Sequence, residues 1–282
     1  MKHRIICWLG LWLLLVGPSV HAATSCSLSG TTSTPVYDPF GASNNDSPQT
    51  VTATCSANPG DPKFPASFAI TVTGTNGSRT LANGGDTVNF ELYTTGCTTP
   101  WQGVTALSVN NSANTGGGPR SFSVSQNFCF RIPLGQNTAK AKPTPYTGNA
   151  TLMMNWTDTG GTLHNDIGTL SMSATINAAC SITTAPIDLT INYTAFSPTA
   201  STGTSNFALR CTNSTPYTLA LDATSGAVSG IGYTLALSAP SGTGTGTAQT
   251  YSINGTAAAG QAGTCAVANC SASQARTLTI SY

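Results

Sequence analysis

The feature that most constrains the fold is a strict alternation of apolar and polar residues in short segments throughout the chain. Phe68, Ile70 and Val72 alternate with Ala69, Thr71 and Thr73. Because successive side chains of a strand point to opposite faces of a sheet, this pattern predicts strands with one buried face. The same pattern recurs in segments 128–132, 152–156, 170–176, 217–221, 233–237 and 278–282. We therefore expect an all-β protein of two immunoglobulin-like β-sandwich domains.

Charge is scarce, and this excludes several classes of protein. Charged residues make up 7% of the 282 residues, and Glu91 is the single glutamate. A chain with so few lysines and glutamates lacks the residues that usually build exposed helices. The ten basic and nine acidic residues form no basic run, so we expect no nucleic-acid partner.

The first 22 residues have the layout of a secretory signal peptide. Lys2 and Arg4 precede an apolar run, Ile5–Val16, and the small-residue site Val20-His21-Ala22 follows. The alternative is a membrane anchor, but the apolar run is too short to cross about 30 Å of hydrocarbon as a helix. We expect cleavage after Ala22 and export of the remaining chain.

Removal of Cys7 with the signal peptide leaves an even number of cysteines, which predicts disulfides in an exported chain. Cys26 and Cys55 are 29 residues apart, and Cys180 and Cys211 are 31 residues apart. This repeated spacing predicts the disulfides Cys26–Cys55 and Cys180–Cys211. Cys97–Cys129 and Cys265–Cys270 are the remaining local pairs. No Cys-x-x-Cys occurs, and His164 is the single histidine after Ala22, so we expect no metal site.

The repeated cysteine spacing divides the chain into two domains. We expect a first domain over residues 23–157, a polar glycine-rich linker over 158–168 and a second domain over 169–282. The glycine- and threonine-rich segment Gly242–Gly246 is interpreted as a flexible hairpin loop.

The second half yields about six strands, whereas an immunoglobulin-like sandwich needs roughly seven. One interpretation is that a strand is missing beside the last strand, so that the edge carrying Leu278, Ile280 and Tyr282 accepts a strand from a partner. The other is that the sandwich is complete. Strand spacing does not decide between them.

Several segments carry a resemblance to a known family. They are Ala174-Thr-Ile-Asn-Ala-Ala-Cys180-Ser-Ile, Phe207-Ala-Leu-Arg-Cys211, Tyr217-Thr-Leu-Ala-Leu-Asp222 and Arg276-Thr-Leu-Thr-Ile-Ser-Tyr282, with more divergent counterparts such as Pro35-Val-Tyr37-Asp-Pro39-Phe40 in the first half. The chain resembles the spore coat protein U domain family, the pilin-like subunits of archaic chaperone–usher pili. The resemblance implies an incomplete second domain, a periplasmic chaperone, an outer-membrane usher and assembly by donor-strand exchange.

The position of Cys26 suggests a place in the fibre. Only residues 23–25 lie between the expected cleavage site and Cys26, which is too short for a donor strand. We therefore predict a pilus tip adhesin that mediates attachment and biofilm formation at the cell surface. The alternatives are a minor pilus subunit without a receptor and a secreted coat protein. Segment 170–176 has an alternative use, which is to fill an edge of the first domain.

No catalytic or cofactor-binding pattern is present, so we expect no enzyme and no cofactor. Candidate residues for binding a host or abiotic surface are Trp101, Pro100 and Val104 in one turn-rich stretch and Phe64 in a proline-rich one. The alternative for Trp101 is that it packs on the core.

Overall fold

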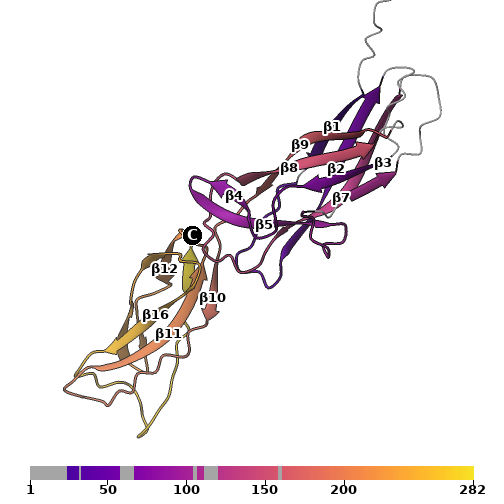
Figure 1. Cartoon of the computed structure of the whole chain (residues 1–282). Helices are drawn as coiled ribbons and strands as arrows, with labels where there is room; N and C mark the ends of the chain where they lie inside the picture. The colour runs from indigo at the N-terminus through magenta and orange to yellow at the C-terminus, as the bar shows by residue number, and fades with distance from the viewer. Residues whose placement is uncertain (1–23, 32, 58–66, 104–106, 111–119, 158–160) are drawn as a thin grey trace, which may run out of the picture.

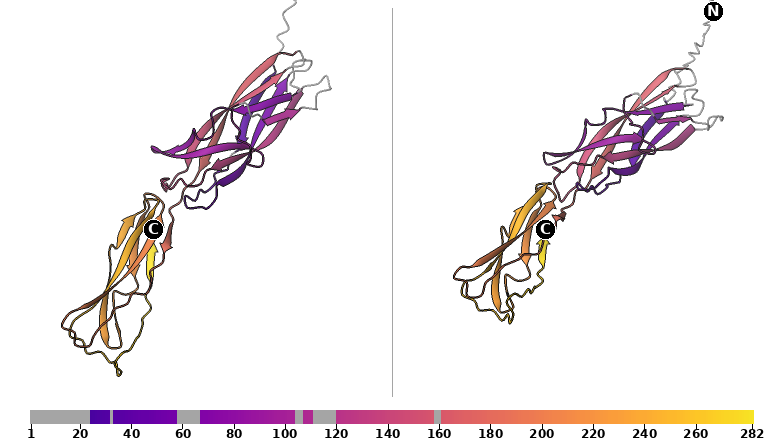
Figure 2. Two further views of the ribbon diagram at one scale, coloured as in Figure 1. Left: turned by 60° about the horizontal axis from the view of Figure 1, so that its bottom comes forward. Right: turned by 90° about the horizontal axis from the view of Figure 1, so that it is seen from below.

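The computed structural model describes residues 24–31, 33–57, 67–103, 107–110, 120–157 and 161–282, and these residues form strands, turns and loops without a helix. The ribbon consists of two elongated lobes placed end to end, each made of curled sheets (Figures 1 and 2). The expected all-β fold of two immunoglobulin-like sandwiches is confirmed. In the described residues, nothing resembles a membrane-spanning helix.

The described residues of the first domain form nine strands. They are β1 (Ser25–Thr31), β2 (Asn45–Ala57), β3 (Ser67–Val72), β4 (Arg79–Asn83), β5 (Asp86–Thr94), β6 (Leu107–Asn110), β7 (Arg120–Ile132), β8 (Tyr146–Thr157) and β9 (Leu163–Ala174). Their order is β1-β2-β7-β5-β4-β8-β3-β6, and β9 pairs with the free side of β8. The predicted inward residues Phe128, Phe130 and Ile132 are buried, as are Leu152, Met154 and Trp156.

The position of β9 corrects the expected domain boundaries. Residues 163–174 run antiparallel to β8 along its whole length, from Leu163 opposite Thr157 to Ala174 opposite Tyr146. Leu170, Met172, Ala174 and Ile176 are buried in the core of the first domain. The linker predicted at 158–168 and the start of the second domain at 169 are therefore wrong, and segment 170–176 fills an edge of the first domain.

The residue that follows β9 is bonded to segment 35–37. Thr175 donates its N–H to Pro35 O at 2.9 Å, and Tyr37 donates its N–H to Thr175 O at 2.8 Å. Val36 forms a parallel bridge with Thr175. These bonds hold the end of β9 in the first domain before the chain continues to β10.

Eight strands make up the second domain. They are β10 (Cys180–Thr184), β11 (Ser201–Cys211), β12 (Pro216–Leu221), β13 (Ser225–Val228), β14 (Ile231–Leu237), β15 (Ser241–Thr243), β16 (Ala248–Ala257) and β17 (Leu278–Ser281). One sheet has the order β10-β11-β16-β14-β13 and the other β15-β12-β17. The expectation of about six strands missed the short β10, β13 and β15. Residues 187–193 form no strand.

The two domains repeat one topology. One sheet order in the first domain is β1-β2-β7-β5-β4, and its counterpart in the second domain is β10-β11-β16-β14-β13. The remaining strands of the first domain have the order β8-β3-β6, and their counterparts have the order β17-β12-β15. Segment 35–37 corresponds to segment 191–193, because Tyr37 and Tyr193 make matching bonds. Tyr37 accepts the N–H of Gln136 at 3.2 Å, and Tyr193 accepts that of Gln261 at 2.7 Å. Strand β9 has no counterpart among residues 177–282.

Four disulfides join the pairs expected from the sequence. Cys26–Cys55 connects β1 to β2, and Cys180–Cys211 connects β10 to β11. Cys97–Cys129 fastens the turn after β5 to β7, and Cys265–Cys270 closes a loop between β16 and β17. Closing a loop of about 30 residues stabilises a fold by roughly 3–4 kcal/mol in the chain-entropy model.

The two domains meet through a few specific contacts. Asn213 donates its side-chain N–H to Thr138 O at 2.7 Å and accepts the N–H of Ala141 at 3.3 Å. The guanidinium of Arg210 lies 4.1 Å from the centre of the Phe40 ring. A Cβ on Gly246 would overlap the carbonyl of Asn137, so glycine permits this approach. Segment Gly242–Gly246 is therefore partly strand and partly junction, not a flexible loop.

Candidate functional site

The uncovered edge of β17 is the most distinctive feature of the second domain. Strand β17 pairs with β12 from Thr218↔Ser281 to Leu221↔Leu278, and none of residues 161–282 pairs with its other edge. In the first domain, the corresponding edge of β8 carries β9. An edge of this kind offers unpaired N–H and C=O groups to another strand.

Side chains along this edge are less buried than their counterparts in the first domain. Leu278 and Ile280 are only partly buried, and Tyr282 is 61% exposed. Their counterparts by pairing with β3, which are Leu152, Met154 and Trp156, are all buried. The fully buried core of the second domain is small and consists of Phe207, Leu209, Cys211, Tyr217 and Leu219.

The first strand of each domain also differs in how well it is covered. Ile182, two residues after Cys180, is 47% exposed, whereas Leu28, two residues after Cys26, packs against the core. A Cβ on Gly168 of β9 would overlap Leu28, so β9 is what covers that position. The position that β9 covers in the first domain is thus exposed in the second.

The buried side chains of the second domain that carry polar groups are uncharged and belong to Ser205, Thr212, Thr215 and Tyr217. Burial raises the pKa of the Tyr217 hydroxyl, and a hydrogen bond with the Tyr251 hydroxyl raises it further. Both desolvation and the neighbouring phenol disfavour the phenolate. The interior therefore presents apolar and neutral surface to an incoming strand.

Trp101, predicted as a surface-binding residue, belongs to the core of the first domain. Its exposed fraction is 0%, its ring lies 5.2 Å from that of Phe128, and its indole N–H donates to Ile70 O at 3.2 Å. The large ring fills interior volume and its single donor is satisfied, so the prediction is wrong. The alternative, packing beneath the turn, is what the structure has.

The other surface candidates are not brought together with Trp101 at an exposed site. Pro100 is partly buried and bridges to Tyr93, and it serves the same turn. Phe64 and Val104 lie outside the described residues. Exposed apolar side chains do occur at the start of β9, where Leu163 and Ile167 are 65% and 73% exposed.

Arg79 is a buried cation that sequence reasoning missed. Its guanidinium donates to Asn76 Oδ1 at 2.7 Å, to Gly74 O at 2.8 Å, to Thr73 O at 3.0 Å and to Trp101 O at 3.3 Å. Burial lowers its pKa, and the charge of Glu91 raises it. These bonds fix the loop after β3 and the turn of Trp101, so the role of Arg79 is structural.

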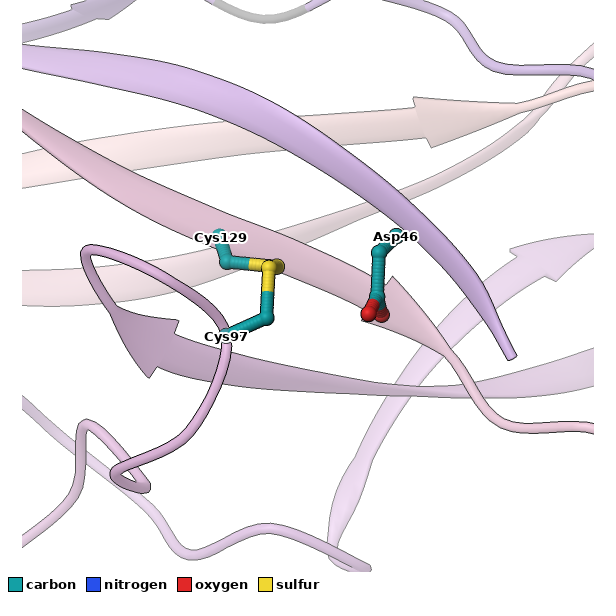
Figure 3. Close-up of side chains that lie close together, drawn as sticks. All are labelled: Asp46, Cys97 and Cys129. Atoms are coloured by element: carbon teal, nitrogen blue, oxygen red, sulfur yellow. A yellow bond between two sulfur atoms is a disulfide. The ribbon is translucent and has the colours of Figure 1, made fainter. Parts of the chain in front are cut away.

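Asp46, Cys97 and Cys129 form a compact group that could suggest a metal site (Figure 3). The two sulfurs are bonded to each other in a disulfide and are not thiolates. Asp46 accepts two hydrogen bonds from Arg131, at 2.6 and 2.7 Å, and this raises the pKa of the guanidinium. All three side chains are thus engaged in structural bonds, and the group is not a metal centre.

The fold defines a disulfide-bonded protein of two immunoglobulin-like β-sandwiches, the second with an uncovered strand edge. Residues 13–152 and 166–243 match the Spore Coat Protein U domain, and the chain belongs to that family. No curated protein sequence matches it.

The chain is similar to several solved structures, among them the following three. The first is the pre-assembly complex of the chaperone CsuC with the tip adhesion subunit CsuE from archaic chaperone–usher Csu pili of Acinetobacter baumannii, at 14% identity and a TM-score of 0.48, covering 92% of this chain and 100% of that chain. The CupB6 tip adhesin of Pseudomonas aeruginosa matches at 12% identity and 0.41, covering 86% and 89%. The CooA pilin subunit of enterotoxigenic Escherichia coli matches at 13% and 0.32, covering 54% and 98%.

Proposed function

We propose that the protein is a non-enzymatic subunit of a chaperone–usher pilus, exported through the periplasm and placed at the fibre tip, and that it mediates attachment and biofilm formation. Its second domain accepts a donor strand from the next subunit, in a groove that a periplasmic chaperone occupies before passage through an outer-membrane usher. The observation that carries the proposal is the contrast between β8, whose edge holds β9, and β17, whose corresponding edge is uncovered.

Strand β9 specifies what the donor must look like. It runs antiparallel to β8 and buries Leu170, Met172 and Ala174 at every second position, and Ile176, two residues after its end, is also buried. By correspondence, a donor strand lies antiparallel to β17 with alternating apolar residues facing the core. Such an addition satisfies the backbone groups of the edge and buries apolar surface in one step.

The test uses the chain's own β9 as the donor. A copy of residues 169–176 is added after Tyr282 through a short flexible linker that permits an antiparallel return. A donor worth about 3 kcal/mol raises the unfolding temperature of a domain of this size by roughly 10–20 °C. Calorimetry measures this, and tryptophan fluorescence identifies the first-domain transition, because Trp101 and Trp156 both lie there.

The matched control is the same addition with the copies of Leu170, Met172 and Ile176 replaced by serine. It keeps the length and the β-forming backbone but removes the apolar side chains. We expect no rise in the second transition for this control. An equal rise for both additions, or none for either, would contradict a missing strand and favour a secreted coat protein with a complete fold.

The first domain is proposed as the attaching part. Leu163 and Ile167 are exposed on β9 at the end remote from the second domain, where they offer apolar contact to an abiotic surface. The double variant Leu163→Ser and Ile167→Thr should lower binding of the full chain to polystyrene beads. Val36→Thr is the control, because Val36 is also exposed but lies beside the C-terminal end of β9. Equal binding by all three proteins would refute this assignment.

A further inference from the structure

The junction between the two domains supplies a pattern for a second junction. On the first-domain side it consists of Phe40 and of segment 137–141, which follows Gln136. On the second-domain side it consists of Arg210, Asn213 and Gly246. The ring of Phe40 faces the guanidinium of Arg210 at 4.1 Å, a geometry in which cation and ring attract each other.

The second domain has counterparts of the first-domain side. Phe196 follows Tyr193 by three residues, as Phe40 follows Tyr37. The turns match, because Ser197 donates its N–H to Thr194 O at 3.0 Å and Gly41 donates to Asp38 O at 3.1 Å. The loop closed by Cys265–Cys270 follows Gln261, as segment 137–141 follows Gln136.

These counterparts are exposed. Phe196 is 71% exposed, and Val267, in the disulfide-closed loop, is 65% exposed. Phe196 has a φ of 58°, which is uncommon for a bulky residue, and its N–H bonds to Gln261 O at 2.9 Å. A phenyl ring held outward by a strained backbone and a fixed turn is costly unless something covers it.

The direction of the donor strand shows what would cover it. Strand β9 runs along β8 toward the junction, and the chain then continues through residues 177–179 into β10 of the next domain. A donor strand beside β17 with the same direction runs toward the end that carries Phe196. The body of the subunit that supplies this strand must therefore follow at that end.

We propose that Phe196 and the Cys265–Cys270 loop form the docking surface for the body of the donor subunit, and that Phe196 packs against a guanidinium of that subunit as Phe40 packs against Arg210. The inference rests on the proposed function, because it requires a donor subunit. It adds a second contact, separate from the groove, that fixes the angle between this chain and the fibre. The expected partner residue is an arginine directly before the second cysteine of the donor domain, the position that Arg210 holds before Cys211.

Photo-cross-linking in the producing cells tests the proposal on the full chain. p-Benzoylphenylalanine replaces Phe196 in one strain and Ala220, an exposed residue on β12, in the control. We expect an adduct with a neighbouring pilus subunit from position 196 and none from position 220, with the cross-linked peptide containing the basic residue before a cysteine. Fibres that carry the chain but give no adduct at 196 would overturn the docking surface and leave the donor-strand proposal intact.

A charge variant gives an independent result. Phe196→Lys places the new ammonium group against the guanidinium of the donor subunit, so we expect fewer fibres to carry an antibody label for this chain. Phe196→Trp keeps an aromatic face and should retain the labelling. Equal labelling for both variants would contradict the cation–ring contact. If the fibres of the unaltered strain carry none of this chain, the proposed function is refuted, and the docking surface with it.

Discussion

Replacing Leu170 with alanine tests directly to which domain β9 belongs. Leu170 lies on the strand that the sequence assigned to the second domain and the structure places in the first. Its side chain is fully buried and occupies the space that a Cβ on Gly30 of β1 would need. The substitution removes three carbon atoms from a site where Gly30 offers no side chain to move into the cavity.

The magnitude follows from this environment. A buried Leu→Ala substitution costs about 2–5 kcal/mol, and a rigid surrounding places it in the middle or upper part of that range. With a slope of about 2 kcal/mol per M urea, the midpoint of unfolding should fall by roughly 1.7–2.5 M. The second domain should be unaffected, because Leu170 belongs to the first-domain core.

Tryptophan fluorescence isolates the domain concerned. Of the four tryptophans, Trp101 and Trp156 lie in the first domain, and Trp8 and Trp12 lie in the expected signal peptide. The control is Leu209→Ala, because Leu209 is equally buried in the second-domain core. It should leave the tryptophan midpoint unchanged while lowering the second calorimetric transition. An unchanged tryptophan midpoint for Leu170→Ala would refute the assignment of β9 to the first core.

Three further substitutions have defined outcomes. Lysine cannot reproduce the forked donors of Arg79, so Arg79→Lys leaves backbone carbonyls unsatisfied. The free energy of unfolding of the first domain, followed by tryptophan fluorescence, should fall by about 1–3 kcal/mol. Hydrogen bonds from Lys140 and Lys142 lower the pKa of Asp86 below its ordinary 3.8, so its contribution is present above that pH and is lost as pH falls through the lower folded-state pKa. Asp86→Asn should therefore flatten the acid limb of stability against pH, and an unchanged limb would contradict this. Gly246→Ala should loosen the junction, because Gly246 has a φ of 78°, and small-angle scattering should then show a broader range of domain orientations with both calorimetric transitions retained.

Much of the fold could be predicted because alternation and cysteine spacing are local signals. Segments such as 128–132 carry their buried face in the sequence itself, and the offset between Cys26–Cys55 and Cys180–Cys211 reveals the repeat. The short strands β10, β13 and β15 escaped because three to five residues with glycine and serine carry no periodic pattern. Their pairing depends on longer neighbouring strands.

The domain boundary could not be predicted, because alternation does not say which core a strand joins. Segment 170–176 precedes Cys180 closely and suits either domain by its pattern. The close approach of Gly168 of β9 to Leu28 and of Leu170 of β9 to Gly30 decides this, and neither contact can be read from the sequence. Trp101 was misplaced for a related reason, since a turn residue can point inward.

The placement of β9 bears on how the molecule carries load. The strand that completes the first domain is also the covalent link to the second, so a force that pulls the two domains apart acts along its axis. Its twelve pairs with β8 are then strained together in shear, instead of opening one after another from an end. A link built this way yields only when the whole ladder slides, so the connection between the two domains resists force cooperatively.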